Sequence, residues 1–150
     1  ARELCAMKTL PLQAKPEADA VRSTLRLFYT YWALKEAYIK MTGEALLAPW
    51  LRELEFTDVV APAPVSGVGS GWGAPYTGVR TWLYGREVTD VRVEVVAFEE
   101  EYIVATAARG DGIGPKSTMD DRDDPWQQLE RIDIDADITS CATGSCHCLV

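Results

Sequence analysis

The sequence predicts an α+β fold in which N-terminal helices pack on a curved antiparallel sheet. Two patterns of spacing predict it. Apolar residues recur every three or four positions over residues 17–41, which is typical of an amphipathic helix. Apolar and charged residues alternate over residues 91–95 and again near 132–138, which is typical of half-buried strands. Since the helices precede the strands, we expect the two kinds of element to be segregated.

The first expected element is a long helix. Pro16 precedes it, and Glu17 puts a negative charge in its first turn, where the helix dipole favours acids. Thr42 and Gly43 should end it, because glycine is the usual residue after a helix. The apolar stripe of this helix, which we expect to face the core, consists of Val21, Leu25, Phe28, Tyr29 and Trp32, and it is extended by Leu34, Ala37, Tyr38 and Met41.

Shorter elements should follow the long helix. We expect a second helix over residues 44–54 and a short strand over 56–60. Residues 61–78 are rich in proline and glycine and predict a long loop. The loop holds Trp72 and Tyr76, which are costly to expose, so we interpret both as partner-binding residues.

Three strands are expected in the second half of the chain. Residues 91–98 and 102–109 should form a hairpin around a turn of three glutamates. Residues 126–138 should form a third long strand. The face of this strand that we expect to point inward consists of Ile132, Ile134 and Ile138.

Composition limits the classes of function. The chain has 150 residues, of which 47% are hydrophobic, so it can bury a substantial core. Its 23 acidic and 15 basic residues give a net charge of −8, which argues against nucleic acid and anionic membrane surfaces as partners. No apolar run approaches the ~20 residues that span a bilayer, so we do not expect the chain to be membrane-spanning.

The domain is expected to span residues 17–138, between an N-terminal arm at 1–16 and a tail at 139–150. Cysteines lie only near the two ends of the chain. We expect at least one disulfide; free thiols and a structural zinc site in the tail are the alternatives. The residues for the disulfide or metal interpretation are Cys5, Cys141, Cys146, His147 and Cys148.

The sequence allows more than one subcellular compartment for the protein. A start at Ala1 fits a chloroplast, mitochondrial or secreted protein from which a presequence has been removed. A remnant of an expression tag fits equally well. Disulfides would favour an oxidising compartment.

The order of elements resembles the nuclear transport factor 2-like superfamily, which includes ketosteroid isomerase, scytalone dehydratase and SnoaL-type cyclases. The resemblance covers residues 17–138. It rests on Leu51–Asp58 after the second helix, on Tyr76–Gly78 before a short element, and on the strands that follow. It implies a sheet that wraps the long helix as a cone around a pocket.

The resemblance also implies two functions. The first is a non-catalytic accessory or binding subunit with protein partners in a larger assembly and no cofactor. The alternative is a small pocket enzyme, an isomerase, dehydratase or cyclase. In that enzyme Asp58 would act as the base, and Tyr29 or Tyr31 would donate to a developing oxyanion. Because no histidine precedes His147, a histidine-aspartate dyad within the domain is excluded.

Overall fold

The computed structural model separates the chain into two compact units, Ala1–Thr118 and Met119–Val150, and each is described by itself. This division lies inside the predicted domain of residues 17–138. The residues that the structure describes are 3, 17–44, 47–66, 71–110, 132–139 and 143.

The main element of the first unit is the helix α2 (Glu17–Thr42), which confirms the long helix predicted from the sequence. Gly43 ends it with a φ of 73°, and its N–H donates to the carbonyl oxygens of Ile39 and Lys40 at 3.1 and 3.3 Å. Glycine adopts this left-handed conformation without a steric penalty. None of the described helices, α2 included, is both long and apolar enough to cross a bilayer.

Three short antiparallel strands form one sheet: β1 (Leu54–Thr57), β2 (Arg80–Leu83) and β3 (Arg86–Val88), in the order β1-β2-β3. Tyr84 and Gly85 connect β2 to β3, with φ values of 51° and 72°. Two consecutive positive φ angles belong to the tight turn that matches the twist of a hairpin.

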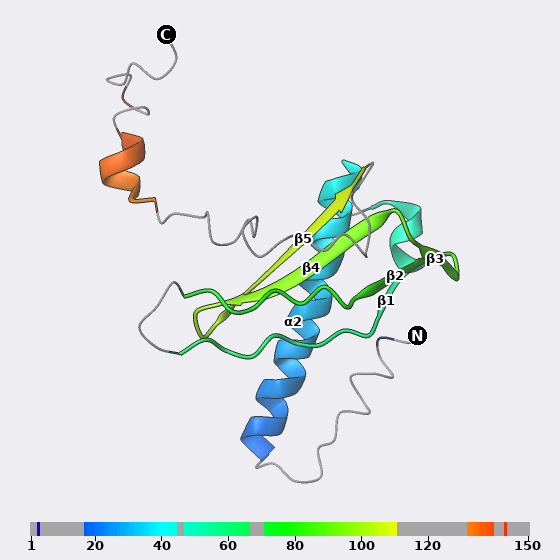
Figure 1. The fold of residues 1–150 in the computed structure, drawn as a ribbon, viewed down its shortest axis with the longest axis horizontal. Coiled ribbons are helices and arrows are strands. Elements are labelled where there is room, and N and C mark those ends of the chain that lie inside the picture. The colour runs from blue at the N-terminus through cyan, green and yellow to red at the C-terminus, as the bar shows by residue number, and fades with distance from the viewer. Residues whose placement is uncertain are drawn as a thin grey trace. The chain divides into compact units, whose positions relative to one another are not determined.

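The long hairpin consists of β4 (Val91–Phe98) and β5 (Tyr102–Arg109), with the bounds that the sequence predicts. The segment with Trp72 and Tyr76 runs along the other edge of β4 (Figure 1). Tyr76 N–H donates to the Val95 carbonyl at 2.8 Å, and Val95 N–H returns a bond at 3.1 Å. The described residues therefore combine a long helix with antiparallel sheets, and they neither show nor exclude a cone.

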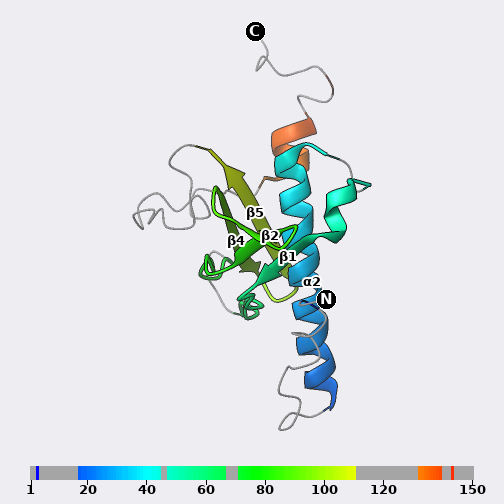
Figure 2. The same ribbon diagram turned by 90° about the vertical axis from the view of Figure 1, so that its right-hand side faces the viewer.

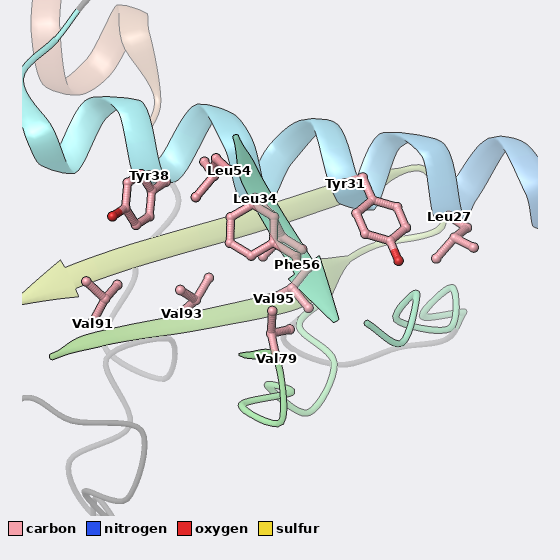
Figure 3. Packing of buried hydrophobic residues seen from close by; sticks show 10 residues of the cluster. All are labelled: Leu27, Tyr31, Leu34, Tyr38, Leu54, Phe56, Val79, Val91, Val93 and Val95. Atoms are coloured by element: carbon pink, nitrogen blue, oxygen red, sulfur yellow. The ribbon is translucent and has the colours of Figure 1, made fainter. Parts of the chain in front are cut away.

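The core of the first unit lies between one side of α2 and the strands. Figure 3 shows Leu27, Tyr31, Leu34 and Tyr38 pointing from α2 toward the strands. Their spacing of four, three and four residues keeps them on one helical face. The strand residues that join this cluster are Leu54, Phe56, Val91, Val93 and Val95, together with Val79 before β2.

The predicted core face of α2 is confirmed in its second half, where Leu34, Ala37 and Tyr38 are buried, and is wrong in its first half. The stripe from Val21 to Trp32 is exposed to solvent, with Trp32 58% exposed and Leu25 47% exposed, whereas Leu34 is fully buried. In both ribbon views the first turns of α2 extend beyond the strands (Figure 2). The helix carries large apolar residues on two faces, and the sequence analysis joined them into one stripe because spacing alone does not select the face that packs.

The predicted second helix over residues 44–54 is wrong where the structure describes it. A short 3₁₀ turn, η1 (Pro49–Arg52), stands there, and the chain is already a strand at Leu54. Proline lacks an amide hydrogen and is tolerated only in the first turn of a helix. Pro49 at the start of η1 therefore marks a new, short element.

The predicted third strand is wrong at its end. In the second unit, Ile134–Ile138 form a helical turn, η4. The Asp133 side chain accepts hydrogen bonds from the backbone N–H groups of Asp135 and Ala136 at 2.9 and 3.0 Å, as an N-cap does. The isoleucines predicted to face inward (Ile132, Ile134 and Ile138) are exposed. Residues 126–131 lie outside the described part of the chain.

Candidate functional site

A polar cluster lies where the middle of α2 meets β1. The ammonium of Lys35 donates a hydrogen bond to the Leu54 carbonyl at 2.7 Å and lies 3.3 Å from Oε2 of Glu3. The other carboxylate oxygen of Glu3 accepts a bond from the Phe56 N–H at 3.0 Å. One carboxylate thus joins the backbone of β1 to Lys35. We call this arrangement the Glu3–Lys35 clamp.

Tyr31 lies one turn before Lys35 and is buried in the same region. Burial raises the pKa of its phenol above the ordinary value, and the negative charges of Glu3 and Asp58 raise that pKa further. Asp58 itself is exposed at the end of β1, with a φ of 57°. Its carbonyl accepts a hydrogen bond from the Tyr76 hydroxyl at 2.7 Å.

Of the residues predicted for a pocket enzyme, Asp58 lies near enough to Tyr31 for its charge to raise the pKa of the phenol. The structure places the third, Tyr29, on the exposed face of α2. The upward shift of its pKa keeps the Tyr31 phenol protonated to a higher pH than an ordinary tyrosine. This phenol can donate a hydrogen bond, and it is a poor proton acceptor.

The raised pKa of Tyr31 predicts a loss of stability in alkali. Folding keeps the Tyr31 phenol protonated, and the associated stabilisation is fully present below a pH of about 10, the pKa of tyrosine in the unfolded chain. This stabilisation is lost as the pH rises through the higher pKa of Tyr31 in the folded chain. Tyr31→Phe cannot ionise, so its free energy of unfolding should fall less than that of the parent chain between about pH 9 and about pH 11. Urea unfolding at both pH values measures this. Tyr29→Phe, on the exposed face, is the control, and its free energy of unfolding should fall with pH as much as that of the parent chain. An equally large fall for Tyr31→Phe would contradict the prediction.

The side of α2 that bears the exposed Trp32 also carries two charged residues. Trp32, Glu36 and Lys40 follow one another at four-residue spacing and share one side of the helix. Glu36 is half-buried and Lys40 is exposed. The sequence analysis missed Lys35, Glu36 and Lys40. The sequence did contain a sign of them, because these three charged residues interrupt a stretch of the long helix that is otherwise mostly apolar.

An open groove of about 800 Å³ leads along this face toward the turn between β4 and β5. Arg26, Tyr29 and Trp32 line it from α2. Arg26 donates from Nε to the Pro62 carbonyl at 2.6 Å and from Nη1 to the Glu100 carbonyl at 2.9 Å. Its Nη2 is buried without a hydrogen-bond partner among the described residues. Burial lowers the pKa of this guanidinium.

Two further sets of site residues were predicted, the partner-binding aromatic residues and the residues of the disulfide or zinc interpretation. The Trp72 ring packs on Phe98 with 4.6 Å between centroids, and both Trp72 and Tyr76 are half-buried. Their role in binding a partner stays a prediction. The residues of the disulfide or zinc interpretation (Cys5, Cys141, Cys146, His147 and Cys148) lie outside the described part of the chain.

Comparison with known proteins provides the family. A family model for the 4'-phosphopantetheinyl transferase superfamily matches residues 5–107. The chain is 60% identical over 162 aligned positions to 4'-phosphopantetheinyl transferase A of Aspergillus fumigatus, covering 98% of this chain and 45% of that protein. It is 61% identical over 135 positions to 4'-phosphopantetheinyl transferase NpgA of Emericella nidulans, covering 83% of this chain and 39% of that protein. The chain thus spans less than half the length of these relatives.

These matches overturn the predicted resemblance to the nuclear transport factor 2-like superfamily, SnoaL-like proteins included. They also overturn the two functions drawn from it, the non-catalytic accessory subunit and the isomerase, dehydratase or cyclase. The error has a physical reason: many unrelated α+β proteins place helices before antiparallel strands, so element order carries little information about function. The chain belongs to the 4'-phosphopantetheinyl transferase superfamily.

Proposed function

We propose that this chain supplies part of the site of an enzyme that transfers a 4'-phosphopantetheinyl group to a hydroxyl of an acceptor protein. One observation carries the proposal. The family match includes all of α2, and α2 places Lys35, Glu36 and Lys40 within two turns of one another beside the exposed Trp32. The names of the relatives support the reaction, and α2 offers the side chains that it needs.

The chemistry sets the requirements of such a site. A donor such as coenzyme A holds the group through a pyrophosphate. The acceptor oxygen forms a new bond to phosphorus, the P–O bond of the pyrophosphate breaks, and the nucleotide leaves with its phosphate. The hydroxyl proton must pass to a base. Positioned positive charge and a proton acceptor are therefore the main contributions that a protein can make.

The side chains of α2 fit these requirements. Lys35 and Lys40 are compact positive charges that suit phosphate oxygens. Glu36 is a carboxylate between them in the sequence, and it can accept a proton from the hydroxyl. The exposed ring of Trp32 offers an apolar surface to the pantetheine arm.

Enzymes that transfer phosphoryl groups commonly use a magnesium ion, which requires oxygen ligands from the protein. The described residues contain no group of three or more histidine, cysteine, aspartate or glutamate side chains that could hold a metal. Magnesium in such sites uses only one or two carboxylates, with the other ligands from phosphates and water. Glu36 fits this smaller requirement. An ion held there would neutralise charge on the donor phosphates.

The proposal is tested with a chimera in which this chain replaces the matching 45% of the Aspergillus fumigatus relative. Transfer from labelled coenzyme A to the apo form of a protein that carries the group is measured by mass spectrometry. We expect the chimera to modify the acceptor. A folded chimera that leaves the acceptor unmodified, beside an active parent relative, would overturn the proposal.

A pair of variants in the chimera tests the role of Lys40. Lys40→Ala should raise the KM for coenzyme A about tenfold or more, as expected when a charged hydrogen bond to a ligand is lost. Arg86→Ala removes an exposed cation from β3, away from α2, and should leave the KM unchanged. Equal effects of the two variants would show that only the overall charge matters.

A further inference from the structure

We propose that Glu3 is a positioning residue, which holds the Lys35 ammonium in place for the phosphate of the donor. This inference rests on the proposed function for the role of Lys35. The placement itself rests on the three contacts of the clamp: Lys35 to the Leu54 carbonyl, Lys35 to Glu3, and Glu3 to the Phe56 N–H.

The clamp restricts a side chain that is otherwise flexible. Lysine has a four-carbon stem and loses considerable rotamer entropy when its charge is fixed. In the clamp two rigid groups fix the ammonium: the carbonyl of Leu54 at the start of β1, and a carboxylate that is itself bound to the β1 backbone. The side chains of Glu3 and Lys35 are only 15% and 28% exposed, so water competes weakly for these contacts.

The clamp leaves Lys35 able to bind a ligand. An ammonium has three N–H groups. Among the described residues, the hydrogen bond to Leu54 and the ion pair to Glu3 occupy two of them. The remaining N–H is available for a phosphate oxygen. A fixed donor binds with less loss of entropy than a mobile one, which is the advantage of preorganisation.

The carboxylate holds this position at one side of β1. Among the described strands β1 pairs with β2 alone, and a buried backbone N–H such as that of Phe56 needs an acceptor. Glu3 supplies that acceptor from a position 53 residues earlier in the chain. Glu3 falls in the segment that the sequence analysis treated as an N-terminal arm, and the structure makes this residue part of the site.

The first experiment measures the kinetics of three variants in the chimera. Glu3→Gln keeps an oxygen for the Phe56 N–H and removes the charge beside Lys35. We expect kcat to fall about tenfold, as expected for a displaced catalytic group. Lys35→Ala should lower kcat further than Glu3→Gln does. The double variant should equal Lys35→Ala alone, because residues that act as a unit are non-additive. Glu53→Gln, an exposed glutamate just before β1, is the matched control and should leave kcat unchanged.

The kinetic outcomes decide the role of Glu3. Wild-type kcat and KM in Glu3→Gln, or losses that multiply in the double variant, would overturn the positioning role. A fall in melting temperature with unchanged kcat would show that Glu3 only stabilises the fold.

A second experiment does not depend on activity, so it separates failure of the clamp from failure of the proposed function. Competitive acetylation of the 150-residue chain, read by mass spectrometry, compares Lys35 with the exposed Lys40. We expect Lys35 to react several-fold more slowly in the parent chain, and Glu3→Gln to remove most of the difference. Equal reactivity of both lysines in the parent would overturn the clamp whether or not the chimera transfers the group.

Discussion

Glu36→Gln is expected to lower kcat for transfer of the phosphopantetheinyl group in the chimera by about 10²-fold or more. This is the usual size of the loss when a general base or a carboxylate ligand is removed. The substitution keeps the shape of the side chain and removes its charge and basicity. Since Glu36 is half-buried on α2 and does not belong to the core cluster, the fold should be unaffected. The rate is measured at saturating coenzyme A and acceptor.

Two controls assign the effect of this variant. A loss of the acidic limb of the pH–rate profile would identify Glu36 as the proton acceptor, whereas a raised requirement for magnesium would identify a metal ligand. Glu44→Gln, which lies beyond the end of α2, is the matched control and should keep the parent rate. A Glu36→Gln variant with the parent rate would remove Glu36 from the site.

The largest expected effect on stability comes from Leu34→Ala. Leu34 is fully buried against the strands, so this substitution leaves a cavity, and we expect the free energy of unfolding to fall by about 3–5 kcal/mol. Leu25→Ala makes the same chemical change on the same helix, where the side chain is 47% exposed. It should cost under about 1 kcal/mol. Urea unfolding of both variants of the 150-residue chain provides the comparison.

Opposite results in this pair would mean that α2 packs through its other face. The sequence analysis assigned Leu25 and Leu34 to the same core-facing stripe, so the experiment shows directly which of the two residues packs. Equal and small losses would mean that neither face of α2 contributes substantially to the stability of the first unit.

The elements that were predicted well depend on local interactions. The end of α2 follows from Gly43, which adopts a left-handed conformation that other residues avoid. The bounds of β4 and β5 follow from the alternation of Val91, Val93 and Val95 with charged residues and from the charged turn and glycine-rich segment that end the two strands. Each of these signals involves residues that are close in the chain, so no tertiary contact is needed to recognise it.

The predictions for residues 134–138 and for the charged residues of α2 failed for different reasons. Residues 134–138 alternate as a strand does, yet the Asp133 side chain caps a helical turn there. Asp58 and Tyr31 were chosen as an acid and a phenol that could share a pocket, and the structure does bring them into one region. Lys35, Glu36 and Lys40 were passed over, because charges on a long helix usually face solvent without a function.

By itself, the sequence determined the long helix and the long hairpin. Only the tertiary structure decided which residues of the predicted α2 stripe are buried, and it alone placed Glu3 beside Lys35. The physical reason is that periodicity defines the faces of a helix, whereas burial depends on which face meets the strands. The clamp could not be read from spacing either, since Glu3 and Lys35 meet through the backbone of β1, which takes this position only once the sheet has formed.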